Sequence, residues 1–417
     1  MTVSLKITVL AAGLMLLAAP TLAQTPPTAN QRALAAGYKA LTTCSAVHTA
    51  REAGASRSPA SVETNELVGI YPELQSLVAG MTAQMSGDVV SVAWDPAAPP
   101  RIATYTPGRG CVIEPMGYVV GSAPARAPLV RRALALDLPN AAPHGDAAAL
   151  NGAVDRAFVQ GFGAGTNTTG VVVLQNGRIV AEHYAPDFGP HVPQRTWSVA
   201  KSLAGTLIGA AVQRGEVDVK ALAAIANWRG EGDPRGAITL ESLMRMASVG
   251  STYRYANNNT LLAVMAIAPT FEAHPPAELF DRLGMTHTFA ETDWRGNYIL
   301  SSQVRTTARD LAKFGQLSVQ DGVWEGQRIL PEGWRTFVST PSGPQPLTGA
   351  FGYGATFWVM NRSEGVPADA FAAFGNRGQY VVIVPSRNVV IVRRGEDPAG
   401  KGFDVAAFAR DVLAALD

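Results

Sequence analysis

The stretch from Thr196 to Gly215 constrains the fold more than any other part of the sequence. Its apolar residues recur with the spacing of one buried helical face, at Val199, Leu203, Leu207, Ile208, Ala211 and Val212. Gly215 follows Arg214, and glycine is the usual residue where a helix ends in a left-handed conformation. The stretch therefore predicts one long helix packed inside a larger domain.

Two polar residues stand in the first turn of this predicted helix. Ser198 lies at its start, and Lys201 follows three residues later on the same face. A hydroxyl beside unpaired backbone N–H groups, with an amine one turn away, can serve as a nucleophile and its base. Alternatively, Ser198 is an N-cap and Lys201 is a solvated first-turn residue. The pair alone leaves both interpretations open.

Length and composition indicate a globular protein with more than one unit. A chain of 417 residues is too long for one ordinary core. The formal net charge is +1, without basic or acidic blocks, so nothing points to nucleic acid or an anionic membrane surface as a partner. No run is apolar and long enough to span a membrane.

The first 23 residues are typical of a signal peptide. Lys6 supplies a positive start, Ile7 to Ala19 form a short apolar run, and Thr21 to Ala23 offer small residues for cleavage before Gln24. We therefore expect the mature protein to be periplasmic or secreted.

Export gives the two cysteines a structural meaning. Cys44 and Cys111 both remain after cleavage and would meet an oxidising compartment. We expect a disulfide between them; the alternative is two unpaired buried thiols.

The chain divides into an N-terminal extension, a linker and a larger domain. Residues 24–125 form an extension of unknown role, with a predicted helix over Ala29–Val47 and predicted strands at Val89–Trp94 and Tyr118–Val120. Residues 126–146 are rich in Ala, Pro and Arg and are interpreted as the linker, which leaves residues 147–417 as the second domain.

Strand patterns lie at both ends of this second domain, with helical patterns between them. Near its start, the sequence predicts a helix over Ala147–Phe158 and a hairpin that turns at Asn176-Gly177. Near its end, it predicts strands at Phe351–Met360, Gln379–Val384 and Asn388–Arg393 and a helix over Phe403–Leu416. The predicted class is α+β: an antiparallel sheet built from both ends, flanked by helices and carrying a helical insert.

Two more short motifs could take part in chemistry. Tyr255 and Asn257 share a loop before an apolar helix, and a phenol near a lysine can have its pKa lowered and act as a base. Gly375 to Gly378 form a Gly-rich turn at a strand edge, where free backbone N–H groups can hold an oxyanion. Read alone, each motif is more typical of an ordinary loop or turn.

In this order the three motifs resemble those of the serine β-lactamase and penicillin-binding-protein superfamily. The sequence looks closest to the class C β-lactamase branch and its esterase and 6-aminohexanoate-dimer hydrolase relatives. The resemblance runs from about Ala147 to the C-terminus and includes Gly177–Glu182, Trp197–Ser202, Leu283–Met285, Thr307–Leu311 and Phe351–Gly354.

The resemblance implies a role for each motif residue. Ser198 would be the acylated nucleophile, Lys201 would activate it, and Tyr255 would shuttle protons. Asn257, Asn376, Arg377 and Gly378 would contact the substrate, with the backbone N–H groups of Ser198 and Asn376 forming the oxyanion hole. The implied substrate is a small ester, amide or β-lactam-like molecule, and no metal or organic cofactor is implied.

The sequence departs from the family pattern in two places. The Lys-Thr-Gly triplet that helps to hold a β-lactam carboxylate is absent, and Gly375-Asn376-Arg377-Gly378 stands there instead. Arg377 would either replace that anion contact or be a solvated strand-edge charge. The segment Ala247–Thr252 is also short, which predicts a more open cleft.

These observations favour an exported serine hydrolase that acts through an acyl-enzyme. The alternatives are a non-catalytic binding or sensor module on the same fold, or a weak β-lactamase or DD-peptidase. The sequence contains neither Gly-x-Ser-x-Gly nor His-Glu-x-x-His, so it favours neither a nucleophile-elbow hydrolase nor a zinc peptidase.

Overall fold

The computed structural model describes residues 26–417 apart from positions 123, 135, 229, 249 and 251. The signal peptide predicted over residues 1–23 lies outside the described residues. Within the described part of the chain, none of the helices combines the length and the apolar character needed to cross a membrane.

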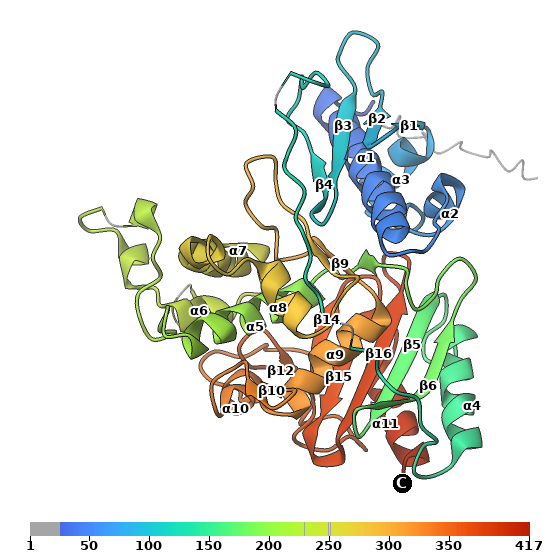
Figure 1. Cartoon of the computed structure of the whole chain (residues 1–417), viewed down its shortest axis with the longest axis vertical. Coiled ribbons are helices and arrows are strands. Elements are labelled where there is room, and N and C mark those ends of the chain that lie inside the picture. Colours follow the sequence, from blue (N-terminus) through green and yellow to red (C-terminus); the bar gives the residue numbers. More distant parts are fainter. Residues whose placement is uncertain (1–25, 123, 135, 229, 249, 251) are drawn as a thin grey trace, which may run out of the picture.

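A seven-stranded antiparallel sheet forms the centre of the larger domain (Figure 1). Its strands, in spatial order, are β12 (Gly352–Tyr353), β13 (Trp358–Val359), β14 (Phe371–Gly375), β15 (Gln379–Val384), β16 (Val389–Gly395), β5 (Thr168–Gln175) and β6 (Arg178–Tyr184). Strand β16, from the end of the chain, pairs with β5, from the start of the domain. The prediction of a sheet built from both ends is thus confirmed.

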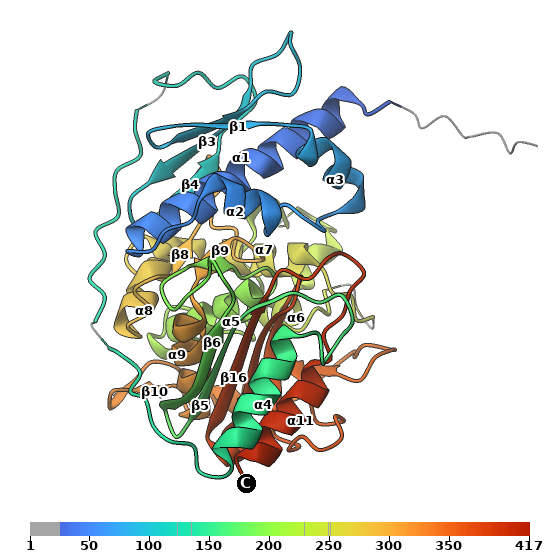
Figure 2. The same cartoon turned by 90° about the vertical axis from the view of Figure 1, so that its right-hand side faces the viewer.

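Helices cover both faces of this sheet. Figure 2 shows α4 (Ala147–Phe158) and α11 (Val405–Ala415) side by side on one face. The other face is covered by α5 (Val199–Gln213) and α9 (Ala308–Val319). In β5, Val171 and Val173 pack toward α4 and α11, whereas Val172 and Leu174 pack toward α5 and α9. A strand buried on both faces explains the continuous apolar run in its sequence.

Local sequence signals set the bounds of several of these elements. The side chain of Asp146 caps α4, and Thr307 Oγ1 caps α9 by accepting from the backbone N–H of Asp310. Asn176 and Gly177, both at positive φ, form the turn between β5 and β6. The predictions of helix Ala147–Phe158 and of this hairpin are confirmed.

An insert of helices separates the two groups of strands. It holds the helices η1 (Ala226–Trp228), η2 (Pro234–Ala237), α6 (Leu240–Met244), α7 (Asn257–Ile267), η3 (Ala268–Phe271) and α8 (Pro276–Arg282). A second, three-stranded sheet pairs β7 (Gln194–Arg195), β9 (Val304–Thr306) and β8 (Phe289–Ala290). The remaining short elements are the hairpin β10 (Val323–Trp324) and β11 (Gln327–Arg328), α10 (Trp334–Ser339) and η4 (Pro385–Arg387).

The N-terminal unit packs a long helix on a four-stranded antiparallel meander. Its elements are α1 (Ala29–Glu52), α2 (Pro59–Thr64), α3 (Pro72–Ala79), β1 (Ala83–Ser86), β2 (Val89–Val92), β3 (Arg101–Thr106) and β4 (Gly110–Ile113). Ala36, Ala40 and Cys44 of α1 face the strands, because small side chains let the helix lie close to the sheet. A disulfide joins Cys44 in α1 to Cys111 in β4, which confirms that prediction. The division at residues 125 and 146 stays a prediction.

Three details of the predicted elements are wrong. Tyr118–Val120 form no strand and lie in a turn region. Phe351–Met360 form two short paired strands, β12 and β13, because the chain reverses between Tyr353 and Trp358. Strand β14 was not predicted, because its Ala372 and Ala373 have little intrinsic preference for a strand.

We expect the disulfide to carry much of the stability of the N-terminal unit. It joins residues 67 positions apart. In the chain-entropy model, closing such a loop raises the free energy of the unfolded chain by about 4 kcal/mol, which stabilises the folded unit. Reduction, or the double substitution Cys44→Ser with Cys111→Ser, should lower the urea midpoint of this unit and leave the larger domain's transition in place. Equal midpoints for the oxidised and reduced protein would contradict this expectation.

Candidate active site

Ser198 lies in a strained turn between β7 and α5. The residue before it, Trp197, has φ +50°, a conformation that costs a bulky side chain about 1–3 kcal/mol unless its surroundings hold it. Ser198 occupies the N-cap position of α5, but its hydroxyl makes no capping hydrogen bond. Ser198 is therefore the N-cap residue by position, as the alternative interpretation held, but its Oγ does not cap the helix and is available for other contacts.

The buried ammonium group of Lys201 connects Ser198 to two other segments. Its Nζ donates to Ser198 Oγ at 2.9 Å, to Asn257 Oδ1 at 2.7 Å and to the carbonyl oxygen of Ser301 at 2.9 Å. Lys201 is only 1% exposed, so it is not a solvated first-turn residue. All three ammonium protons have an oxygen partner, which is what allows this charge to be buried.

Burial lowers the pKa of Lys201 to about 8. With this pKa, about one tenth of the lysine is a neutral amine at neutral pH. A neutral amine hydrogen-bonded to a serine hydroxyl can accept its proton, so the geometry gives Lys201 the properties of a general base.

Tyr255 lies over the same pair, just before α7. The Nζ of Lys201 is 5.1 Å from the centroid of its ring. Burial raises the pKa of the Tyr255 hydroxyl, while hydrogen bonds with Ser198 and Trp358 act in the opposite direction. The expectation that the nearby lysine lowers this pKa is wrong, because desolvation outweighs the other effects. Tyr255 is therefore a neutral phenol at neutral pH. It is better suited to donating a proton than to accepting the proton of the Ser198 hydroxyl.

Asn257 contributes to the arrangement through its side-chain oxygen. That oxygen accepts from Lys201, and the residue lies exposed at the first position of α7. The contact holds the start of α7 against the start of α5, and an exposed amide at that position can face a substrate.

The end of strand β14 lies directly against the Ser198 turn. A Cβ atom on Gly375 would come within 2.3 Å of the carbonyl oxygen of Thr196 and 3.1 Å of the backbone nitrogen of Ser198. Only glycine fits here, and its small size brings the next residue, the exposed Asn376, beside the nucleophile. The two backbone N–H groups predicted to hold an oxyanion thus belong to neighbouring turns; their role stays a prediction.

Arg377 is not the solvated strand-edge charge that the sequence offered as one alternative, and a substrate contact of Gly378 stays a prediction. Arg377 is 5% exposed, and its Nε donates to Glu396 Oε2 at 2.8 Å, so it is not a solvated charge. Its Nη2 donates to the carbonyl oxygen of Asn65 at 3.0 Å, while its buried Nη1 has no hydrogen-bond partner among the described residues. Gly378 has φ +78°, and a Cβ there would meet the guanidinium of Arg393. Both residues shape the turn.

An aromatic wall, made of Tyr255, Tyr353, Trp358 and Phe374, was missed by the sequence analysis. The ring of Tyr255 lies 5.3 Å from Trp358 and 6.0 Å from Tyr353, and Trp358 stacks on Phe374 at 5.7 Å. Phe374 directly precedes Gly375, so this wall follows β14 to the predicted oxyanion turn. The run of aromatic residues from Phe351 to Trp358 was the available signal.

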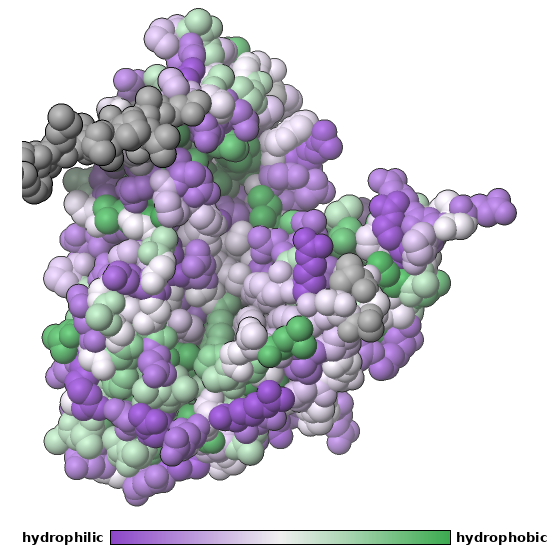
Figure 3. Space-filling model, turned by 180° about the vertical axis from the view of Figure 1, so that it is seen from behind, coloured by the Kyte–Doolittle hydropathy of each residue, from purple (hydrophilic) through white to green (hydrophobic). Residues whose placement is uncertain are grey.

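The N-terminal unit also reaches the site. The ring of Tyr71 makes an edge contact with Trp197, at 6.1 Å between centroids. Figure 3 shows the surface hollowed where the N-terminal unit, at the top, approaches the helical insert, at the right. Tyr71 belongs to the N-terminal unit, whereas Trp197 precedes α5 and Tyr255 precedes α7. Across the described residues, no three His, Cys, Asp or Glu side chains form a set that could hold a metal ion.

Comparisons with known proteins agree with this arrangement. The profile of the beta-lactamase family matches residues 154–414. The 6-aminohexanoate-dimer hydrolase of Paenarthrobacter ureafaciens is 25% identical over 292 residues, a match that covers 56% of this chain and 74% of that protein.

Two solved structures share the fold. A Bacillus anthracis protein whose name assigns it provisionally to the 6-aminohexanoate-dimer hydrolases superposes with a TM-score of 0.54 at 20% identity, over 67% of this chain and 86% of its own. A penicillin-binding-protein homologue from Caulobacter crescentus superposes with a TM-score of 0.51 at 16% identity, over 67% of this chain and 99% of its own. At such identities these two likenesses show the fold alone.

Substituting Gly375→Ala should disturb the site directly. The added methyl group would overlap with backbone atoms on two sides, so we expect a loss of about 1–3 kcal/mol in the free energy of unfolding. Urea unfolding measures the loss. Gly189→Ala is the matched control, because a Cβ there meets no atom within 4 Å. Equal unfolding free energies for the two variants would contradict the close approach of β14 to Ser198.

Proposed function

The chain belongs to the beta-lactamase family, and we propose that it is an exported serine hydrolase that cleaves a small ester or amide through a covalent acyl-serine intermediate. The observation that carries the proposal is the contact between Lys201 Nζ and Ser198 Oγ, which is 2.9 Å long, with the centroid of the Tyr255 ring 5.1 Å from the same Nζ. A nucleophile and a base of suitable pKa are thereby held within hydrogen-bonding distance.

The proposed acylation begins with neutral Lys201. As the Ser198 Oγ forms a bond to the substrate carbonyl carbon, its proton passes to Lys201 Nζ, and the carbonyl oxygen becomes an oxyanion. The backbone N–H groups of Ser198 and Asn376 would stabilise that charge.

Collapse of the tetrahedral intermediate then breaks the bond to the leaving group. The leaving alkoxide or amine takes the proton of the Tyr255 hydroxyl, and Tyr255 regains a proton from Lys201. Water attacks the acyl-serine through the same steps in reverse order, which releases the acid and restores Ser198.

The residues around the site favour a substrate without a carboxylate beside the scissile bond. The guanidinium of Arg377 is paired with Glu396, so it cannot act as a free anion contact in place of the missing Lys-Thr-Gly triplet. The aromatic wall offers apolar surface next to the nucleophile. The name of the Paenarthrobacter relative also points to an amide. We therefore propose esters and amides without a carboxylate beside the scissile bond, in preference to β-lactams.

Export is a further part of the proposal. Residues 1–23 have the pattern of a cleavable signal peptide, and the Cys44–Cys111 disulfide is suited to an oxidising compartment. Intact mass spectrometry of protein from the periplasm and medium would report cleavage at Ala23 and the state of the disulfide together.

An aryl phosphonate probe should label the wild-type protein at Ser198. Ser198→Ala should abolish the mass increase, because it removes the hydroxyl that lies 2.9 Å from Lys201 Nζ. Ser202→Ala is the matched control: Ser202 lies on the same helix, but its hydroxyl is committed to the carbonyl oxygen of Thr356, so labelling should persist. Labelling of Ser198→Ala at the wild-type rate would refute the nucleophile. An unlabelled wild type that binds a cell-wall fragment would favour the non-catalytic alternative.

The pH dependence of labelling should identify the base. Because the neutral form of Lys201 accepts the proton, the rate should rise about tenfold per pH unit below pH 8 and level off above it, in line with a pKa of about 8. If Tyr255 were the base, the rate would continue to rise beyond pH 10, because burial raises the pKa of that phenol above 10.0. A rate independent of pH between about 6 and about 9 would exclude Lys201 as the base.

A further inference from the structure

Both predicted oxyanion donors lie next to a bulky residue with left-handed backbone. Trp197, with φ +50°, precedes Ser198, and Arg377, with φ +56°, follows Asn376. Such residues persist only where the surrounding structure holds them. If either turn relaxed to an ordinary conformation, the adjacent N–H group would rotate away from the position of the substrate oxygen.

A single segment of the N-terminal unit, Asn65–Tyr71, contacts both of these residues. The carbonyl oxygen of Asn65 accepts from Arg377 Nη2 at 3.0 Å, and the ring of Tyr71 lies edge-on to the ring of Trp197 at 6.1 Å. Between these two contacts, the carbonyl oxygen of Gly69 accepts from the backbone N–H of Ala399 at 2.7 Å. The segment therefore spans the two turns that carry the donors.

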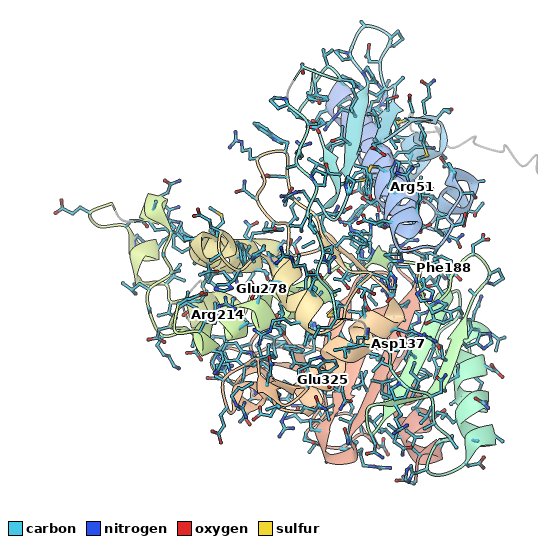
Figure 4. All side chains as sticks on the ribbon, viewed as in Figure 1. Arg51, Asp137, Phe188, Arg214, Glu278 and Glu325 are labelled. Carbon is cyan, nitrogen blue, oxygen red and sulfur yellow. A yellow bond between two sulfur atoms is a disulfide. The ribbon has the colours of Figure 1, made fainter. Side chains whose placement is uncertain are left out.

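The segment is itself fixed to the larger domain by contacts away from the donors. Arg57 pairs with Glu66 through side chains that are almost fully buried, and its Nη1 donates to the carbonyl oxygen of Asp187 at 3.0 Å. The guanidinium carbon of Arg57 also lies 4.2 Å from the ring centroid of Phe188, which Figure 4 labels at the junction of the two units. The backbone at Gly69 also packs closely against the larger domain, because a Cβ there would come within 2.6 Å of Pro398 Cα.

We infer that segment Asn65–Tyr71 holds the oxyanion hole in its working geometry, with Arg377 and Tyr71 as the positioning residues. The inference rests on the proposed function and gives a role to the N-terminal unit, which lies outside the region matched by the family profile. Arg377 links the turn at Asn376 to Asn65 and Glu396. Tyr71 packs on Trp197 and limits the movement of the turn at Ser198.

The sharpest test compares Arg377→Ala with Arg377→Gly. Both variants lose the guanidinium contacts to Asn65 and Glu396, but glycine adopts a positive φ without steric cost and alanine does not. We expect Arg377→Ala to slow phosphonate labelling of the folded protein by about tenfold or more, since small displacements of catalytic groups have effects of this size or larger. Arg377→Gly should recover most of the wild-type rate. A purely structural ion pair would lower the melting temperature of both variants and leave labelling per folded molecule unchanged.

Tyr71→Ala tests the other contact and does not depend on the folding of the Arg377 variants. Tyr71 is 41% exposed, so its truncation should be tolerated, while the labelling rate and kcat fall severalfold with little change in KM. Arg126→Met is the control: the side chain of Arg126 contacts Glu114, Thr104 and Trp294 and neither of the two turns, so its loss should leave labelling unchanged.

The outcomes separate this inference from the proposed function. A wild-type protein that the phosphonate does not label would refute the proposed function and the inference with it. A labelled wild type, with Tyr71→Ala and Arg377→Ala both at the wild-type rate, would overturn the inference alone. Equally slow labelling of Arg377→Ala and Arg377→Gly would also overturn it. The contacts of Arg377 with Asn65 and Glu396 would then matter for a reason other than holding residue 377 in its left-handed conformation.

Discussion

The burial of the Lys201 ammonium group is the interaction on which the rest of the site depends. A lysine that is 1% exposed must satisfy its three protons, and it does so with oxygens from three segments: α5, the start of α7 and the loop before β9. None of these partners is a carboxylate, so desolvation is not offset by an opposite charge and the pKa falls to about 8. The burial that joins the helical insert to the central helix therefore also lowers the pKa of this amine.

The sheet contributes a different constraint, which is close approach. Strand β14 can end beside the Ser198 turn only because Gly375 has no side chain, and the turn that follows uses Arg377 and Gly378 at positive φ. Arg393 fills the space under Gly378, and its Nη1 donates to the Gly378 carbonyl oxygen at 2.9 Å. Buried charged side chains thus fix the backbone of the turn, while Tyr255, Trp358 and Phe374 of the aromatic wall remain partly exposed next to it.

Much of the fold could be predicted because its signals are local. Asp146, the Asn176-Gly177 turn and Thr307 mark element ends within a few residues, and the pairing of strands from both ends followed from their placement. Strand β14 was missed because Ala372 and Ala373 become strand residues only through pairing with β13 and β15. The order of the motifs suggested which residues would lie together, and the structure brings Ser198, Asn257 and Tyr255 around Lys201. The environment of Arg377 could not be predicted, because its partners are distant in the sequence. The direction of the Tyr255 pKa shift could not be predicted either, because it depends on burial. The contact of Tyr71 with Trp197 left no signal in the sequence, since it joins two separate units.

The most direct test of the central claim is a crystal structure of the phosphonylated protein, with Ser198, Lys201, Tyr255 and the two turns resolved. We predict a bond from phosphorus to Ser198 Oγ, with the phosphoryl oxygen about 2.7–3.1 Å from the backbone nitrogens of Ser198 and Asn376. Lys201 and Tyr255 should remain within hydrogen-bonding distance of the serine oxygen or of the leaving-group position. A phosphoryl oxygen directed away from both nitrogens, or an adduct on a residue other than Ser198, would contradict the account.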